Sequence, residues 1–146
     1  MNICISLLDS LKEDGSDEAL GAYDNICSYL TIAGKVTEQT KDFWAPLADY
    51  CLRMENDEVE VEHVIEFFVE QLKVNKEVMA VKEKIVNLLV QLFFGRFYSF
   101  MKNDKEFEQQ VVDLKVYLQS IPKKQLQDMA RRGSDFVKKN FANFWQ

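Results

Sequence analysis

The amino-acid sequence predicts an all-α protein, a single-domain bundle of seven or eight helices packed around one buried, apolar central helix. Apolar residues recur at helical spacing in most segments, and only five Gly and two Pro interrupt the 146-residue chain. The composition, 47% hydrophobic and 29% charged, is that of an ordinary globular protein. One stretch, residues 85–101, is apolar around its circumference, which is typical of a helix inside a core.

The central helix is expected over residues 75–103. Its first apolar positions recur at helical spacing: Val78, Val81, Ile85, Leu88, Leu92 and Phe93. Further apolar residues then fill the other faces, so the segment is expected to be buried. Polar residues interrupt the run at Asn87, Gln91, Arg96 and Ser99. Because a membrane span needs about 20 predominantly apolar residues, we expect no transmembrane anchor.

Two helices are expected at the N-terminus. Residues 3–11 form a short apolar helix, which the Asp14-Gly15 pair ends. Ser16 or Asp17 is the predicted N-cap of the second helix. Gly34 is expected to end this helix in a left-handed conformation.

Two more helical segments precede the central helix. Thr37 is the predicted N-cap of the first, and Pro46 is expected to break or kink it into two short pieces. After the Asn56-Asp57 break, the apolar period of residues 61–72 predicts the second. Asn75 is then the predicted cap of the central helix.

Three helices are expected after the central one. Residues 107–118 form a one-sided helix that ends before Pro122, the predicted first residue of the next helix. Gly133 is expected to end that short helix. Ser134 is the predicted cap of a last helix, which carries residues 136–144.

The charge is distributed unevenly along the chain. The net charge is −6, but residues 1–95 carry 8 Lys and Arg against 18 Asp and Glu, whereas residues 96–146 carry 10 against 6. An acidic body argues against nucleic-acid binding, which requires neutralisation of phosphates. The basic C-terminal third is compatible with an anionic partner, although a solvated surface is the simpler interpretation.

The sequence predicts no metal site and no cofactor. Cys4, Cys27 and Cys51 form no C-x-x-C pair, and His63 is the one histidine. The acidic run of residues 55–66 lacks the glycine and ligand spacing of a calcium loop, so we expect a solvated face there. Cys27 and Cys51 lie on apolar faces and are expected to be buried thiols, and the role of Cys4 stays open.

The protein is not expected to be an enzyme. The chain contains no Gly-rich phosphate loop, no G-x-S-x-G and no H-E-x-x-H, and His63 is interpreted as a surface residue. No signal peptide is visible in the first ten residues, so we expect an intracellular, cytoplasmic protein. Residues 1–146 are long enough to form one domain without disulfides.

The order of the predicted helices and two short motifs resemble the Bcl-2 family of apoptosis regulators. Lys105-Glu106 opens the helix after the central one, as a D-K-E stretch does in many members. Residues 133–137, Gly-Ser-Asp-Phe-Val, resemble the family's second homology motif, G-W-D-x-F-V. Here Ser134 replaces the Trp, and one residue is missing before Phe136.

The family's first homology motif, N-W-G-R, is not matched at the start of the central helix. Lys84-Ile85-Val86 is one candidate for its Arg and the apolar pair that follows, which makes Lys84 the candidate groove cation. Gly95-Arg96 is the rival match, although it leaves a short central helix. These departures resemble the virus-encoded members, which keep the fold while losing the motifs.

The resemblance implies an apoptosis inhibitor that sequesters the amphipathic BH3 helix of a pro-apoptotic partner in a surface groove. Such a groove supplies apolar contacts at i, i+3, i+4 and i+7 and a cation for the ligand's acid. Association with the mitochondrial surface would then depend on the partners. The candidate groove residues, each of which also suits a core, are Tyr23, Ile26, Leu30, Val64, Phe68, Val81, Lys84, Ile85 and Leu88.

The alternative function is a helical adaptor or assembly subunit that acts through protein–protein contacts without a ligand groove. It would use the acidic N-terminal face or the basic C-terminal face. The sequence leaves the identity of the ligands, the oligomeric state and the formation of a homodimer open.

Overall fold

A computed structural model describes the backbone of residues 2–144 and the side chains of residues 5–144. This part of the chain is all-α and holds ten α-helices and one 3-10 helix, η1. Their bounds are α1 (Asn2–Asp14), α2 (Asp17–Val36), α3 (Lys41–Cys51), α4 (Glu58–Val74), α5 (Lys76–Met79), α6 (Lys82–Phe93), α7 (Tyr98–Asn103), η1 (Lys105–Phe107), α8 (Glu108–Gln119), α9 (Lys123–Arg131) and α10 (Asp135–Phe144).

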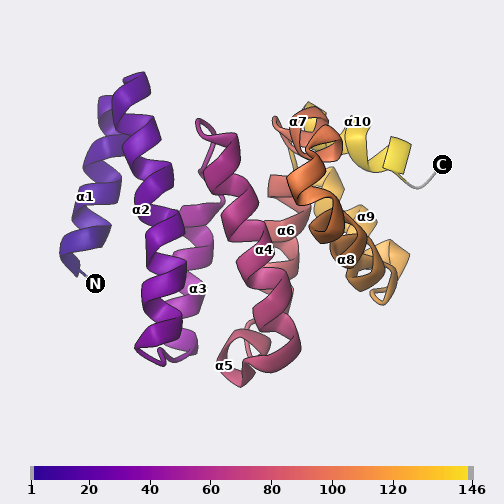
Figure 1. The fold of residues 1–146 in the computed structure, drawn as a ribbon, viewed down its shortest axis with the longest axis horizontal. Coiled ribbons are helices and arrows are strands. Elements are labelled where there is room, and N and C mark those ends of the chain that lie inside the picture. The colour runs from indigo at the N-terminus through magenta and orange to yellow at the C-terminus, as the bar shows by residue number, and fades with distance from the viewer. Residues whose placement is uncertain (1, 145–146) are drawn as a thin grey trace.

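The longer helices form two layers (Figure 1). Helices α2, α4 and α8 lie side by side in the front layer, and α3, α6 and α9 lie behind them. Successive helices alternate between the layers, so α2 packs against α3 and α4 packs against α6. Helix α1 lies at one edge of the molecule and α10 at the other. Helix α6 is therefore the middle helix of the rear layer.

The core is centred on α6, as the sequence predicted for this segment. Helix α6 contacts α3, α4 and α9, which cover it from three sides. Its buried residues are Ile85, Val86, Leu88, Leu89, Val90, Leu92 and Phe93. Two aromatic clusters extend this core, one around Trp44 with Phe67 and Phe68, and one around Phe94 with Tyr98.

Residues 75–103 form α5, α6 and α7 instead of the single helix that was predicted, which explains why the helix count exceeds eight. Asn75 does act as a cap, since two backbone N–H groups donate to its side-chain oxygen, but the helix it caps is only four residues long. After α6, a Cβ on Gly95 would lie 2.6 Å from the carbonyl oxygen of Gln91. The tight turn that leaves α6 therefore requires glycine.

The predicted end of α2 is wrong. Helix α2 continues to Val36, so Gly34 lies inside it, and Thr37 is its C-cap and not the N-cap of the next helix. The reason for the glycine is packing, because a Cβ on Gly34 would lie 2.4 Å from the Phe43 ring and 2.7 Å from the Trp44 ring. Glycine here allows α3 to approach α2 closely.

The predicted break at Pro46 is also absent, since α3 runs through Pro46 from Lys41 to Cys51. Proline removes one backbone hydrogen bond from a helix interior. The buried side of α3, which includes Trp44 and Leu47, offsets this loss by packing against α2 and α6.

Two of the predicted N-caps are confirmed. Ser16 accepts a hydrogen bond from the Ala19 N–H at 3.2 Å, and Ser134 accepts one from the Val137 N–H at 3.4 Å. Pro122 was predicted to be the first residue of the next helix, but it lies directly before α9, which begins at Lys123.

Within the described residues, no helix has both the length and the apolar character needed to cross a membrane.

The two predicted core thiols meet between α2 and α3. Cys27 and Cys51 are both completely buried. A hydrogen bond with the Cys27 thiol and burial raise the pKa of the Cys51 thiol well above its ordinary value. Because a thiol reacts as the thiolate, Cys51 is protected chemically as well as sterically. The side chain of Cys4 lies outside the described side chains.

Truncation of Leu88 tests the central position of α6. Leu88 is fully buried, so Leu88→Ala is expected to lower the free energy of unfolding by about 2–5 kcal/mol, the range for a Leu that leaves a cavity. Urea denaturation followed by circular dichroism measures the loss. Val112→Ala on α8 is the control, because Val112 is 49% exposed and its loss should stay within about 0.5 kcal/mol. Equally small losses in both variants would show that α6 is peripheral.

Candidate functional site

The structure places six of the nine predicted groove residues in the core. Tyr23, Leu30, Val64, Phe68, Ile85 and Leu88 are buried on α2, α4 and α6. Ile26 and Val81 are partly buried and pack against this core, and Lys84 is exposed. A partner helix therefore reaches the six buried side chains only if the two layers separate. Their role in binding stays a prediction.

A trough does run along the side of α6 that the neighbouring helices leave uncovered. It consists of two adjoining depressions of about 430 and 480 Å³, which share Asn87 and Arg132 as lining residues. We call the two together the α6 trough. The lining residues are Ala45, Leu52, Glu55, Ala80, Val81, Glu83, Lys84, Asn87, Gln91, Gly95, Arg96, Arg132, Gly133, Ser134 and Val137.

The floor of the α6 trough is a polar strip of α6 itself. Lys84, Asn87 and Gln91 follow one another at steps of three and four residues, so they lie on one face of the helix. The strip has a detectable sequence signal, since Asn87 and Gln91 are two of the polar residues that interrupt the apolar run. Sequence reasoning treated them as interruptions and did not include them in the site.

One wall of the trough comes from α3 and the other from the turn between α9 and α10. Gln91 ties the second wall to the floor, because its Nε2 donates to the backbone oxygen of Met129 at 2.8 Å and to Asn87 Oδ1 at 3.2 Å. Gly133 permits this approach, since a Cβ there would lie 2.4 Å from Gln91 Oε1. The packing of α9 on α6 thus shapes the trough.

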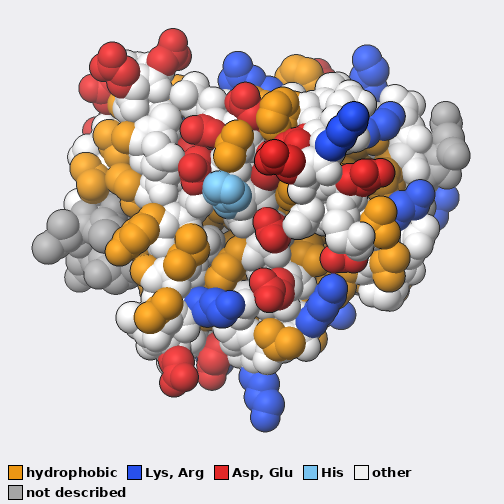
Figure 2. All heavy atoms as spheres, viewed as in Figure 1, with side chains coloured by type: hydrophobic (Ala, Val, Ile, Leu, Met, Phe, Trp, Pro, Cys, Tyr) orange, Lys and Arg blue, Asp and Glu red, His pale blue; other side chains and the backbone are white. Residues whose placement is uncertain are grey.

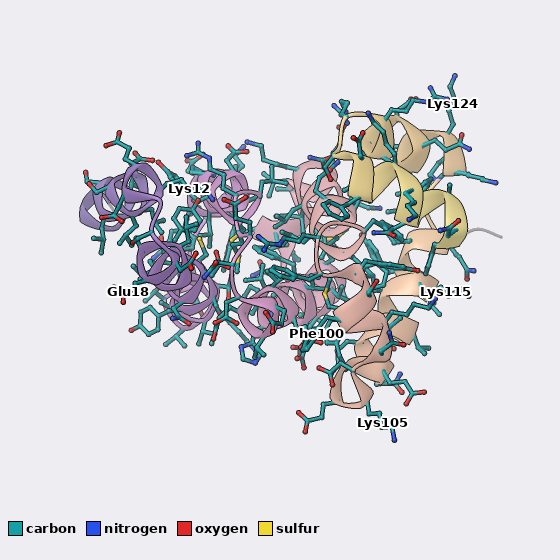
Figure 3. All side chains as sticks on the ribbon, turned by 90° about the horizontal axis from the view of Figure 1, so that it is seen from above. Lys12, Glu18, Phe100, Lys105, Lys115 and Lys124 are labelled. Carbon is teal, nitrogen blue, oxygen red and sulfur yellow. The ribbon has the colours of Figure 1, made fainter. Side chains whose placement is uncertain are left out.

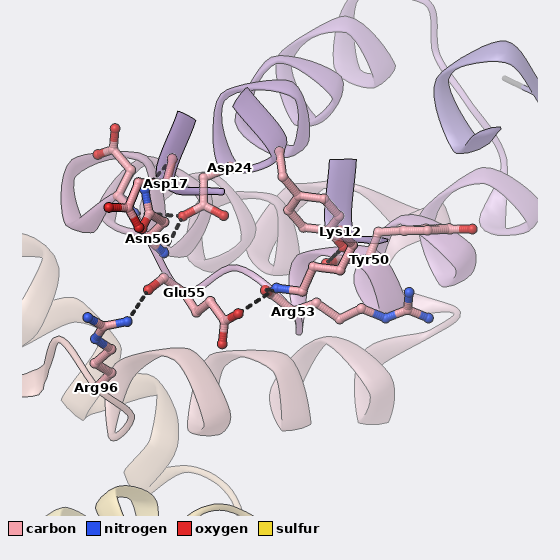
Figure 4. Close-up of polar contacts among 10 residues, drawn as sticks. Lys12, Asp17, Asp24, Tyr50, Arg53, Glu55, Asn56 and Arg96 are labelled. Carbon is pink, nitrogen blue, oxygen red and sulfur yellow. Dashed lines mark hydrogen bonds and ion pairs between the residues drawn. The ribbon is translucent and has the colours of Figure 1, made fainter. Parts of the chain in front are cut away.

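The two candidate groove cations, Lys84 and Arg96, line opposite parts of the same trough. Lys84 Nζ lies 2.8 Å from Asp49 Oδ2 in a pair whose side chains are 42% and 49% exposed. Arg96 Nη1 donates to the backbone oxygen of Glu55 at 2.9 Å (Figure 4). Within residues 5–144 no carboxylate forms an ion pair with Arg96 or Arg132. The trough therefore retains positive charge for an anionic group.

The loop between α3 and α4, which closes one end of the trough, is attached to α2 by a buried carboxylate. Asp24 Oδ2 accepts hydrogen bonds from the backbone N–H groups of Asn56 at 2.9 Å and Asp57 at 2.7 Å (Figure 4). Asp24 is 1% exposed, and burial raises the pKa of its carboxyl group. The two backbone donors compensate part of the cost of burying it.

Glu55 joins the same loop to α1. Its carboxylate accepts a hydrogen bond from Lys12 Nζ at 2.9 Å, while its backbone oxygen accepts the bond from Arg96 (Figure 4). The loop thus links α1 with the turn after α6. This connection holds Arg96 at the end of the trough.

The acidic run of α4 is only partly the solvated face that was predicted. Figure 2 shows Asp and Glu side chains in the middle of the front face, beside the histidine. Glu62, however, is only 6% exposed, and its Oε2 has no hydrogen-bond partner. Burial, which is the largest cause, and the neighbouring carboxyl groups of Asp104, Glu106 and Glu58 together raise the pKa of Glu62 to about 8. Glu62 is therefore mostly protonated at neutral pH.

The single histidine of the chain, His63, does not line the α6 trough. His63 is an exposed residue whose Nδ1 lies 3.6 Å from Glu60 Oε2 on the same helix. In the described part of the chain, no group of three or more His, Cys, Asp or Glu side chains is placed to hold a metal ion. The α6 trough is thus the candidate site that the geometry favours.

Comparisons of the chain with protein-family models, with curated proteins and with solved structures find no match. The function is therefore inferred from the geometry of the trough and from the motifs of the sequence.

Glu62→Gln is expected to stabilise the protein at alkaline pH and to have little effect at pH 4. The folded pKa of about 8 exceeds the ordinary value of 4.5, so the folded state holds a proton that the unfolded chain releases. The free energy of unfolding is therefore highest, as far as Glu62 is concerned, below pH 4.5. It falls as pH rises from 4.5 through 8, because the folded state must then release the proton. Glutamine avoids this loss, and the expected gain at pH 9 is about 1–3 kcal/mol.

Thermal unfolding of both proteins between pH 4 and pH 9 measures this difference. Glu70→Gln on the exposed side of α4 is the control, and it should shift stability by no more than about 0.5 kcal/mol. A difference between the parent and Glu62→Gln that does not change with pH would show that the Glu62 carboxyl group titrates normally.

Proposed function

We propose that the protein is a binding module that holds a helical segment of another protein in the α6 trough. The single observation that carries this proposal is that Lys84 and Arg96, the two cations singled out in the sequence, line two adjoining depressions that share Asn87 and Arg132. A helix bound in a groove is typically fixed by apolar side chains at i, i+3, i+4 and i+7 and by a charge pair for its acid. The trough offers Ala45, Ala80 and Val81 beside Lys84 for such contacts.

The length of the trough suits a short helix. From Lys84 to Gln91 the floor covers seven residue steps of α6, or about 10 Å at 1.5 Å per residue. A partner helix of about two turns has the same length. Its acidic residues would lie opposite Lys84 at one end and opposite Arg96 at the other, with Arg132 between the two ends.

The resemblance to the Bcl-2 family supports the identity of the partner. We infer that the bound segment is the BH3 helix of a pro-apoptotic protein and that the protein inhibits apoptosis by sequestering it. The virus-encoded members supply the nearest likeness, so the proposed place of action is the cytoplasm of a host cell. Any association with mitochondria would then come through the partner.

Reversal of the charge at Lys84 tests this function. Lys84→Glu is expected to lower the affinity for a BH3 peptide by roughly 30-fold or more relative to the parent protein. The substitution replaces an attraction by a repulsion in a partly desolvated contact. Isothermal titration calorimetry with a panel of BH3 peptides measures the affinities. Folding should be retained, since Lys84 is exposed and its pair with Asp49 is a surface pair.

Two further variants make the test specific. Asp49→Asn removes the ion-pair partner of Lys84 and should tighten peptide binding by up to about fivefold. This factor corresponds to the free energy of an exposed ion pair. Lys35→Glu, on the exposed last turn of α2, should leave the affinity unchanged. The proposal is wrong if the parent binds no peptide of the panel or if Lys84→Glu binds as tightly as Lys35→Glu does.

A second candidate function, an assembly subunit, is supported by an exposed apolar stripe on α2. Tyr29, Ile32 and Val36 are 68%, 56% and 76% exposed and lie at i, i+3 and i+7 on one side of the helix. Figure 2 shows hydrophobic side chains gathered over this part of the front face. Exposed apolar stripes of this kind mark contact surfaces between proteins.

Ile32→Asp tests the assembly function. If α2 mediates association between copies of the chain, sedimentation velocity should show a concentration-dependent dimer that Ile32→Asp abolishes, because a carboxylate is not tolerated in a dry contact. Val116→Asp on α8 is the control, since Val116 is 63% exposed and lies outside the stripe. A parent protein that stays monomeric at every concentration would contradict self-association through α2.

A further inference from the structure

A second depression, separate from the α6 trough, lies between α9 and α10. Its volume is about 340 Å³. Residues of α9 at steps of three to four line one side of the depression, and residues from the middle of α10 line the other. We call this depression the α9–α10 pocket, and its principal lining residues are Lys123, Gln127, Arg131, Lys138, Phe141 and Ala142.

Three cations surround the α9–α10 pocket and are largely unneutralised. Within residues 5–144 no carboxylate forms an ion pair with Lys123 or Lys138. Arg131 Nη1 lies 3.2 Å from Asp128 Oδ1, but these side chains are 75% and 52% exposed. Such a pair is weak in water and exchanges readily for another anion.

The position of Lys123 is unfavourable for the helix that carries it. Lys123 and Lys124 occupy the first turn of α9, where the helix dipole disfavours cations, and this turn contains no acid and no side-chain cap. Helix α10 follows the usual rule, with Ser134 before it and Asp135 in its first turn. The cations at the start of α9 are therefore not explained by helix stability. They suit an anion that comes from outside the chain.

The shape of the pocket indicates what kind of anion fits. Lys123 and Arg131 are separated by eight residue steps of α9, or about 12 Å. An extended peptide covers this distance with about four residues at 3.3 Å each. The remaining lining includes three apolar residues, the buried Ala130 and Phe141 and the exposed Ala142. The pocket thus offers both positive charge and an apolar contact.

A peptide fits these features better than a membrane surface does. Phe141 is only 6% exposed, so the aromatic ring of the pocket is recessed and does not protrude into lipid. Figure 3 shows Lys115 and Lys124 on the side of the molecule where the C-terminus lies, and Lys115 Nζ is 5.5 Å from the centre of the Phe144 ring. These additional cations raise the local positive potential and favour the approach of an acidic chain.

We propose that the α9–α10 pocket binds a short acidic segment of a partner protein in extended form. Carboxylates at the two ends of the segment contact Lys123 at one end and Arg131 with Lys138 at the other, and an apolar side chain between them rests against Phe141. This site lies apart from the α6 trough and requires no helix in that trough.

Fluorescence anisotropy with a defined probe tests the proposal on the full chain. The probe is a fluorescein-labelled peptide, Glu-Glu-Leu-Leu-Glu-Glu, and saturable binding that weakens with added salt is expected. The double variant Lys123→Glu/Lys138→Glu should bind it at least about 10-fold more weakly. The matched double variant Lys35→Glu/Lys73→Glu changes the net charge equally at exposed sites on α2 and α4 and should bind as the parent does.

Three results would overturn the proposal. The first is a parent protein that does not bind the probe, including the case in which it binds only vesicles of phosphatidylcholine and phosphatidylserine. The second is an equal loss of affinity in the two double variants, which would show an effect of overall charge. The third is equal binding of Glu-Glu-Ser-Ser-Glu-Glu, which would exclude the apolar contact. Lys84→Glu distinguishes the two sites, since it should lower the affinity for BH3 peptides and leave the affinity for this probe unchanged.

Discussion

Burial of the apolar side of α6 is the constraint on which the rest of the structure depends. Each fully buried Leu, Ile or Phe contributes about 1.5–3 kcal/mol relative to an exposed one, and α6 buries seven of its twelve residues. Helices from both layers meet on this one element: α3 and α9 beside it and α4 in front of it. The positions of these helices follow from the need to cover α6.

The two layers cannot cover α6 completely, and the uncovered strip determines the candidate site. Lys84, Asn87 and Gln91 face the space that α3 and α9 leave between them. Gln91 also binds the backbone of α9, and Gly133 makes room for this contact. The interactions that position α9 on the core therefore also form one wall of the trough, and the proposed binding there depends on the packing of α9.

Charge is distributed unevenly over the front face of the molecule (Figure 2). Acidic side chains occupy the middle of the front face, whereas Lys and Arg gather toward the side of α8 and α10 (Figure 2). At the end of α9, the neighbouring residues Arg131 and Arg132 contribute to different surfaces: Arg131 lines the α9–α10 pocket and Arg132 lines the α6 trough. One short helix thus separates the two proposed binding sites.

The sequence by itself determined the all-α class, the caps at Ser16 and Ser134 and the burial of Cys27 and Cys51, because helix periodicity and capping are local properties. Only the tertiary structure decided the two-layer order of the helices, the division of residues 75–103 into three helices and the place of Phe68 in the core. A periodic apolar face shows that a helix is covered, but it does not show whether its own chain or a partner covers it.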